Sequence, residues 1–249
     1  MRWHNVILLI LLSALSRSAY AQFVTTTLDA RGSAMGGCLM LDTDKRVVSV
    51  AYRQTFAIAG LADKRLTLLW PTGKVGLAAA TYMHHGNIDY HEQQASLGYA
   101  IRPMDWLLVG VAGKWLNIGT SDPHYIPQHW LAATAFLQTS MAHTKLSLLT
   151  GTRPWNKRFP YRLHLQVQYV PVSNMLTVAE FEFEECARLR MGMEYDYEHL
   201  LLFRAGIATA PLVATFGIGF RHRLLSIDLG VEVHQVLGVT PHTTLSVCF

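Results

Sequence analysis

Apolar and polar residues alternate along almost the whole chain after residue 47. Residues 225–234 (LSIDLGVEVH) have an apolar residue at every odd position and a polar or small residue at most even ones. Residues 161–169 (YRLHLQVQY) and 188–195 (RLRMGMEY) follow a similar rule. Because successive side chains of a strand point to opposite faces, this pattern predicts strands with one apolar and one polar face. Helical periodicity is hard to find, so the fold class is all-β.

Turn residues such as those of 71–73 (PTG), 85–87 (HGN) and 171–174 (PVSN) separate the alternating runs. We expect about fourteen strands, with twelve as the alternative. Their ranges are 47–58, 63–71, 74–84, 88–101, 105–118, 128–138, 142–150, 160–171, 174–183, 186–196, 199–209, 212–221, 223–234 and 241–249.

Two architectures suit many alternating strands: a soluble sandwich and a transmembrane antiparallel β-barrel. Charged residues make up only 15% of the chain, against about 25% in ordinary soluble domains. Small residues crowd the polar face, and aromatic residues lie near the ends of many runs, as in the girdles of membrane barrels. A closed barrel also removes the sheet edges that lipid does not tolerate. We therefore predict a membrane barrel over residues 47–249, with its apolar face outward.

The first residues have the composition of an export signal. Residues 1–21 (MRWHNVILLILLSALSRSAYA) combine a basic start, a short apolar core and an A-x-A site, which predicts cleavage after Ala21. The apolar run is too short for a membrane-spanning helix. Without this segment Lys and Arg number 21 − 2 = 19 against 17 Asp and Glu, so the charge does not indicate a nucleic-acid partner. Residues 22–46 do not alternate, and we expect a plug or lead-in segment.

The last strand ends on an aromatic residue. Leu245, Val247 and Phe249 lie on one face of residues 241–249. An aromatic residue at the end, preceded by apolar residues at every second position, resembles the signal by which the assembly machinery recognises outer-membrane barrels.

Several short motifs occur in the order found in one protein family. Residues 29–38 (DARGSAMGGC) are similar to the G-A-R-A-x-x-M-G-G-A segment of PorV/PorQ-like outer-membrane proteins, distant relatives of the long-chain fatty-acid transporters. Residues 179–182 (AEFE), 187–195 (ARLRMGMEY), 203–206 (FRAG), 216–220 (FGIGF) and 237–242 (LGVTPH) resemble later motifs of the same family. The family's N-P-A segment is missing, and the chain is short for the group. The resemblance implies a fourteen-stranded barrel and, for some members, a role in type IX secretion.

The resemblance and the alternation together give the candidate residues. The N-terminal glycine motif is Arg31, Gly32, Met35, Gly36 and Gly37.

Eight charged residues share the polar face and would point into the lumen: Glu180, Glu182, Arg188, Arg190, Glu194, Arg204, Asp228 and Glu232. They suit either a charged constriction that sorts solutes or, as we favour, ion pairs that hold neighbouring strands together.

The twelve histidines and three cysteines give no recognisable metal site, and we expect no cofactor. The sequence lacks a G-x-S-x-G elbow and an H-E-x-x-H string, so we assign no catalytic residue.

We therefore expect an outer-membrane barrel of a Gram-negative bacterium with a role in transport or type IX secretion. It would either pass solutes or dock exported proteins. A lipid-modifying enzyme and a purely structural barrel are the alternatives. The expected partners are outer-membrane lipid, the barrel-assembly machinery and secretion-system proteins, without nucleic acid. The permeant, the state of the lumen and the oligomeric state stay open at this point.

Overall fold

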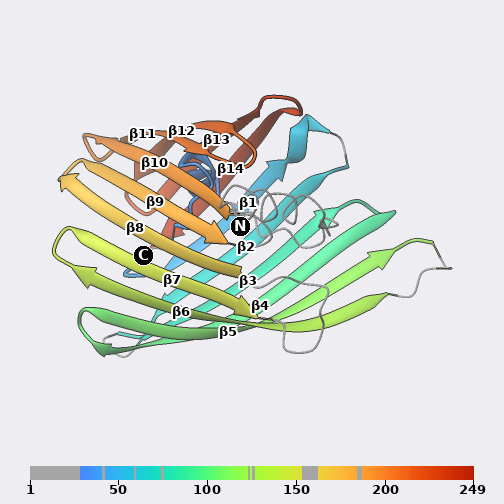
Figure 1. Ribbon diagram of the computed structural model, residues 1–249, viewed down its shortest axis with the longest axis horizontal. Coiled ribbons are helices and arrows are strands. Elements are labelled where there is room, and N and C mark those ends of the chain that lie inside the picture. Colours follow the sequence, from blue (N-terminus) through green and yellow to red (C-terminus); the bar gives the residue numbers. More distant parts are fainter. Residues whose placement is uncertain are drawn as a thin grey trace, which may run out of the picture.

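Fourteen strands form one closed antiparallel barrel in the computed structural model (Figure 1). The structure describes residues 29–40, 43–58, 60–73, 76–122, 124, 127–152, 162–183 and 187–249. The predicted export signal, its cleavage site and residues 22–28 lie outside the described residues.

The strands, in chain order, are β1 (Val47–Gln54), β2 (Ala62–Pro71), β3 (Gly76–Gly86), β4 (Tyr90–Met104), β5 (Leu107–Thr120), β6 (Gln128–Met141), β7 (Thr144–Thr152), β8 (Arg162–Val172), β9 (Met175–Phe183), β10 (Ala187–Tyr197), β11 (Leu201–Ala208), β12 (Val213–His222), β13 (Leu225–His234) and β14 (Gly238–Cys248). A short helix, α2 (Ala30–Ala34), precedes them, and a 3-10 turn, η1 (Thr55–Ala57), follows β1.

Each strand pairs with its neighbours in the sequence, and β1 closes the barrel by pairing with β14. In that pair Val47 lies opposite Cys248 and Arg53 lies opposite His242. The predicted all-β barrel of fourteen strands is confirmed, and the alternative of twelve is wrong. Closure leaves no unpaired sheet edge, as a barrel in lipid requires.

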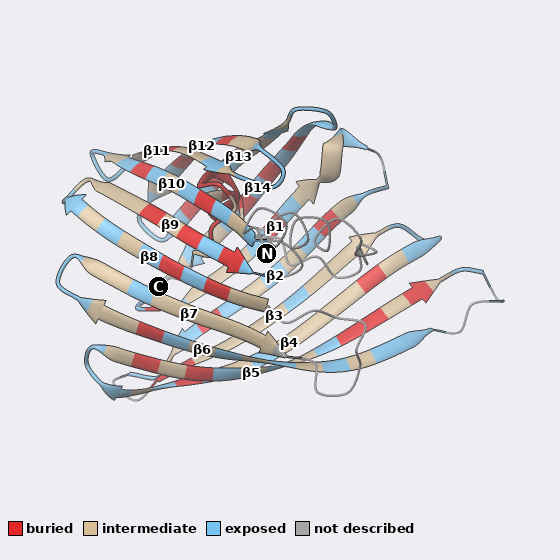
Figure 2. Ribbon diagram, viewed as in Figure 1, coloured by how far each residue is buried: buried red, intermediate tan, exposed pale blue. Residues whose placement is uncertain are grey.

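Polarity in this barrel is inverted relative to a soluble protein. On β13 the exposed fractions of Leu225, Ile227 and Leu229 are 39%, 37% and 53%, whereas Asp228 between them is 5% exposed. Figure 2 shows this alternation of exposed and buried positions along many of the strands. The apolar face therefore points outward, as predicted. Of the aromatic residues near the ends of the predicted strands, Tyr82, Tyr99, Trp106, Trp115, Tyr169 and Tyr195 are exposed. Trp130, near the start of β6, instead shares the inward face of that strand with Gln138.

Strand boundaries differ from the prediction by up to four residues, and the first and last strands show why. β14 begins at Gly238, three residues before the predicted start, and contains Pro241. Pro241 is tolerated because β1 pairs with β14 only from His242 onward, which leaves Pro241 paired on the β13 side alone. β1 ends at Gln54 because Thr55–Ala57 turn inward, where Phe56 N donates a hydrogen bond to Thr240 Oγ1 (2.9 Å).

The two ends of the barrel have different connections. At one end, which we call the turn end, the strands are joined by two to four residues, as at 72–75 and 223–224. Residues 43–46 and Phe249 lie at the same end, where Phe249 N donates a hydrogen bond to Arg46 O (3.0 Å). The opposite loop end carries longer connections, including 55–61 and 121–127. Within the described residues, no helix is long and apolar enough to cross a membrane.

Candidate functional site

The described part of the lead-in segment lies inside the barrel. Helix α2 begins after Asp29, whose side chain accepts a hydrogen bond from Gly32 N (2.9 Å). The helix packs against β11, β12, β13 and β14 (Figure 1). Ala30, Ala34 and Met35 are completely buried, and Figure 2 shows the helix as a buried coil within the ring of strands. One side of the lumen is therefore occupied by residues 29–40.

Four inward glycines of β10–β13 make room for this segment. Gly192 pairs with Gly206, and Gly217 pairs with Gly230. A Cβ atom on Gly192 would lie 2.5 Å from Met35 O, and one on Gly217 would lie 2.5 Å from the Cβ of Ala34. A Cβ atom on Gly206 would collide with Gly36 N, and one on Gly230 would lie 2.8 Å from Ala30 O. We call these four residues the glycine seat, because any side chain there would collide with the segment.

Hydroxyl groups of the barrel wall satisfy the polar backbone of the segment. Ala30 N donates a hydrogen bond to Thr244 Oγ1 (2.8 Å), and Gly36 N donates one to Thr215 Oγ1 (2.9 Å). Thr215 Oγ1 in turn donates to Ala34 O (2.9 Å). Two threonines thus bind both ends of a helix too short to be stable alone.

A chain of alternating charges links the segment to β10, β11 and β13. Arg31 makes two bonds to Glu194, at 2.8 and 2.7 Å. Glu194 also accepts a bond from Arg204 Nε (2.6 Å), and Arg204 Nη1 reaches Asp228 Oδ1 on β13 (2.6 Å). Arg204 crosses over β12 at Gly219, where a Cβ atom would lie 2.6 Å from Asp228 Oδ1. Each of these four charged groups therefore has an opposite charge in contact.

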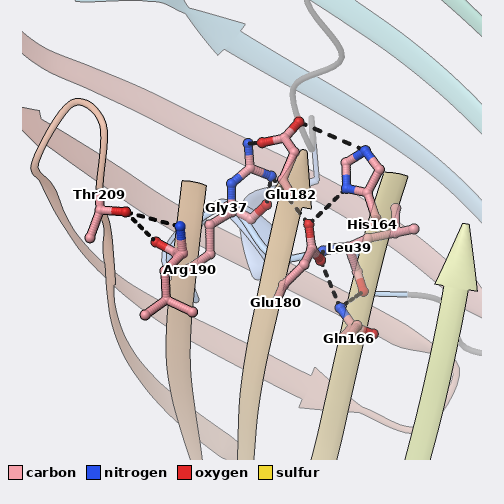
Figure 3. Close-up of polar contacts among 9 residues, drawn as sticks. Gly37, Leu39, His164, Gln166, Glu180, Glu182, Arg190 and Thr209 are labelled. Atoms are coloured by element: carbon pink, nitrogen blue, oxygen red, sulfur yellow. Dashed lines mark hydrogen bonds and ion pairs between the residues drawn. The ribbon is translucent and has the colours of Figure 1, made fainter. Parts of the chain in front are cut away.

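A second polar cluster, drawn in Figure 3, binds the part of the segment after Gly36 to β8, β9 and β10. Leu39 N donates a hydrogen bond to Glu180 Oε2 (2.7 Å), and Gln166 Nε2 donates one to Leu39 O (2.7 Å). Arg190 Nη1 donates to Gly37 O (2.7 Å). The segment is thus bound from Ala30 to Leu39 by strands β8–β14 together.

Glutamate and histidine side chains complete the same cluster. Arg190 forms ion pairs with Glu180 (3.4 Å) and Glu182 (2.5 Å). His164 lies between the same two carboxylates, with Nδ1 3.0 Å from Glu180 Oε1 and Nε2 3.7 Å from Glu182 Oε1 (Figure 3). Opposite charges on adjacent strands stabilise their pairing.

The structure places all eight charged candidates on inward faces of the barrel. Six of them form the two networks above. The remaining two, Arg188 and Glu232, line a small cavity beside Gly36 and Gly37. Glu232 also lies 3.2 Å from His242 Nε2. The charges are gathered on one side of the lumen, against the segment, and do not form a ring around an opening.

The N-terminal glycine motif supplies the turn that follows α2. Gly36 and Gly37 have φ angles of 77° and 78°, which favour glycine. Gly32 lies so close to Cys38 that a Cβ atom would be 2.5 Å from its carbonyl oxygen. Met35 fills the space over Gly192, and Arg31 makes the ion pair with Glu194. The C-terminal residues Leu245, Val247 and Phe249 point outward, with exposed fractions of 47%, 36% and 50%.

Asp44 connects the lead-in segment to the far wall at the turn end. Its carboxylate accepts a hydrogen bond from Arg102 (3.0 Å) and lies 3.5 Å from Lys145 Nζ. Partial burial raises the pKa of Asp44, but the Arg102 hydrogen bond and the two positive charges outweigh it and hold the pKa below its ordinary value. Residues 43–46 therefore bridge from the seated segment toward β4 and β7.

Sequence reasoning named Glu180, Arg190 and Glu194, which bind the segment, but it missed the other residues that do. Thr215 and Thr244 and the four seat glycines are inward by parity, but nothing in the sequence says that a helix lies over them. It also missed an ion cluster toward the loop end, in which Asp63 contacts Arg53 (2.6 Å) and His85. The parity of β1, β2 and β3 would have placed those three side chains inside.

The histidines that the structure describes do not assemble a metal site. His242 pairs with Glu232, and His234 Nδ1 accepts hydrogen bonds from Val236 N and Leu237 N (both 3.1 Å) in the turn that follows β13. In the described ranges, no group of three His, Cys, Asp or Glu residues is arranged to hold a metal ion.

No family model matches the sequence, and no curated protein matches it. Among solved structures, the chain is similar to the TodX deltaS2S3 mutant monoaromatic hydrocarbon channel (TM-score 0.61, 10% identity, 91% of this chain and 98% of that chain). It is also similar to the toluene transporter TbuX of Ralstonia pickettii (TM-score 0.59, 10% identity, 88% and 97%). A triple-mutant porin of Rhodopseudomonas blastica matches at a TM-score of 0.51 (6% identity, 82% and 99%).

The fold is that of the TodX and TbuX outer-membrane barrels. At these identities the likeness concerns the fold, and it agrees with the fourteen-stranded closure and the inverted polarity described above.

Proposed function

We propose that the protein is an outer-membrane barrel that passes small solutes through its lumen. The observation that supports this proposal is that residues 29–40 lie against one side of the lumen. Helix α2 lies over β11–β14, and the following residues bind β8–β10, whereas β2–β6 line the opposite side. The similarity to TodX, TbuX and a porin supports a transport role without catalysis.

The connections support an orientation in the outer membrane. Short turns face the periplasm and longer loops face outward in barrels of this kind. The turn end would therefore be periplasmic. Outer-membrane lipid would contact the apolar face, and the assembly machinery would recognise the end of β14.

The side of the lumen opposite the segment would present a solute with an apolar surface next to a hydroxyl-lined one. Near the turn end, Leu69, Leu77, Ala100 and Leu108 form a buried apolar cluster that points inward. Next to it lies a row of hydroxyl residues that includes Thr81 and Ser96, whose oxygens share a hydrogen bond. A solute crossing between the segment and β2–β5 would meet both surfaces.

Vesicle efflux tests this proposal. Full-length protein is reconstituted in phosphatidylcholine vesicles loaded with radiolabelled small sugars, amino acids and aromatic compounds. We expect faster efflux of at least one class than from protein-free vesicles. Thr81→Trp places a large side chain in the proposed path and should slow that efflux, whereas Tyr82→Trp, on the outward face of the same strand, should not.

Two results would contradict the proposal. Efflux of every solute class at the protein-free rate would exclude a solute path. Equal efflux from the Thr81→Trp and Tyr82→Trp proteins would place the path elsewhere. Folding of each variant is checked by the heat-dependent migration of the barrel in gels.

The order of sequence motifs favours one second candidate, docking of exported proteins in type IX secretion. The motif of residues 29–38 and the AEFE and LRMGMEY stretches resemble PorV/PorQ-like proteins. In the lumen, Arg31 and Gly37 of the first motif contact Glu194 and Arg190 of the last, and Leu39, just after the first motif, contacts Glu180 of the AEFE stretch. Purification from membranes of the native host separates the candidates. A stable complex with secretion-system subunits, together with absent solute efflux, would favour docking.

A further inference from the structure

A row of hydroxyl side chains crosses the lumen wall from β13 to β4. Direct cross-strand pairing joins Ser226 to Ser246, Ser246 to Ser49, Ser49 to Thr67, Thr67 to Thr81, and Thr81 to Ser96. All six residues share the inward parity of their strands. We call them the hydroxyl row.

Cationic residues flank this row. Arg221 pairs with Ser226 at one end, and Lys114 pairs with Ser96 at the other. Arg65 lies two residues from Thr67 on the inward face of β2. Among the described residues, no hydrogen bond or ion pair joins the side chains of Arg65, Lys114 or Arg221 to another group.

Acidic groups balance these cations only in part. Asp29 lies within electrostatic reach of Arg65, but its carboxylate also accepts the hydrogen bond from Gly32 N that caps helix α2. The other inward carboxylates near the row have partners elsewhere: Asp228 binds Arg204, Glu232 binds His242, and Asp63 binds Arg53. Positive side chains along the hydroxyl row therefore outnumber the acidic groups that could neutralise them.

Part of the row lines a cavity of about 150 Å³ near the turn end. Ser49, Thr67, Ser226 and Ser246 contribute hydroxyls, while Arg65, Arg221 and Lys45 contribute positive charge. Val47 and Leu69 form an apolar part of its lining. Arg31, Arg204 and Asp228 also line the cavity, but they belong to the charge network described above. Asp29 lines it too, and its carboxylate caps helix α2.

We propose that this cavity binds a phosphate group. Guanidinium groups match the oxygens of phosphate with paired hydrogen bonds, and hydroxyl groups donate further bonds to the same oxygens. The cavity is lined by Lys45, Arg65 and Arg221 against the single carboxylate of Asp29 outside the charge network, and this excess of positive charge suits a dianion better than a monocarboxylate. The proposed binding site is argued from the geometry of the cavity alone. Only the idea that the cavity lies on a solute path rests on the proposed function.

Calorimetry with inorganic phosphate tests the site. Phosphate is titrated into full-length folded protein in a zwitterionic detergent at pH 7 and constant ionic strength. The Arg65→Gln/Arg221→Gln protein should bind phosphate about tenfold or more weakly, because each lost bond to a charged group contributes more than 1 kcal/mol. Lys64→Gln, an equal charge change on the outward face beside Arg65, should leave the affinity unchanged.

Folding of the variants is checked separately from binding. If the double variant does not fold, Arg65→Lys keeps the charge but loses the paired geometry, and a severalfold weaker affinity for phosphate is then expected. An unchanged affinity in Arg65→Lys would count against the site, as would unchanged affinity in a folded double variant.

Two further results would overturn the proposal: no heat of phosphate binding to the wild-type protein, or equally tight binding of acetate. Nanodiscs distinguish free phosphate from a lipid headgroup. Two disc types are compared, one with phosphatidylglycerol and one without it. Loss of the heat of phosphate binding only in the discs with phosphatidylglycerol would show that a lipid phosphate occupies the cavity. Retention of that heat in both disc types would show that the cavity binds soluble phosphate. Calorimetry measures binding and not flux. If the protein binds phosphate but the vesicle experiment shows no solute efflux, the proposed function fails and the phosphate site stands.

Discussion

At the scale of single residues, Arg204 is the cation that joins two acidic side chains in the lumen. Its guanidinium contacts Glu194 and Asp228 at 2.6 Å each, and only 1% of its side chain is exposed. Removing one partner of a buried ion pair leaves an uncompensated charge, which costs far more than the pair itself contributes.

Arg204→Gln should therefore lower the free energy of unfolding by about 3–5 kcal/mol. The measurement is the urea midpoint, followed by tryptophan fluorescence in detergent micelles. Arg188→Gln serves as the matched control, since Arg188 is also inward, on the neighbouring strand β10, but makes no ion pair with a described residue. A similar midpoint for both variants would show that the network contributes little.

At the scale of elements, each strand of this barrel is specified mainly by the alternation between a face toward lipid and a face toward the lumen. Leu229 lies at the middle of β13 with 53% of its surface exposed, on the outward face. Leu229→Arg should destabilise the protein by about 2–4 kcal/mol, because a charge near the bilayer midplane is costly. Urea unfolding in phosphatidylcholine vesicles measures the effect.

Val236→Arg is the control for that substitution. Val236 lies in the turn between β13 and β14 and is 85% exposed, so the same charge should cost about 0–1 kcal/mol there. Equal costs at both positions would mean that β13 does not face lipid.

The strands could be predicted from the sequence because the period of two is local information. All fourteen predicted ranges overlap the observed strands, and parity alone placed Glu194, Arg204 and Asp228 inside. Their pairing could not be predicted, because Arg204 reaches Asp228 across an intervening strand. That contact depends on the register of three strands and on the missing side chain of Gly219.

At the scale of the whole molecule, the lumen has two unlike sides. Residues 29–40 cover β8–β14, and the hydroxyl row and apolar cluster lie mainly on β1–β6. The sequence predicted a separate lead-in segment from its lack of alternation. It could not place that segment, because the seat is built from glycines whose only sequence signal is an absent side chain. The inward glycines read equally well as the small residues of a curved wall.

Gly206→Val tests whether the seat holds the segment. A Cβ atom there would lie 2.5 Å from the carbonyl carbon of Met35, so the valine should displace residues around Met35. Cys38 is completely buried in the wild-type protein and should become reactive toward a maleimide reagent in the variant. Cys186 and Cys248 are replaced by serine throughout, so that labelling reports Cys38 alone.

Gly113→Val is the matched control, because a Cβ atom on that glycine of β5 meets nothing within 4 Å. Labelling of Cys38 at the same rate in both folded variants would mean that the segment is held by its hydrogen bonds and ion pairs, with no need for the glycine seat.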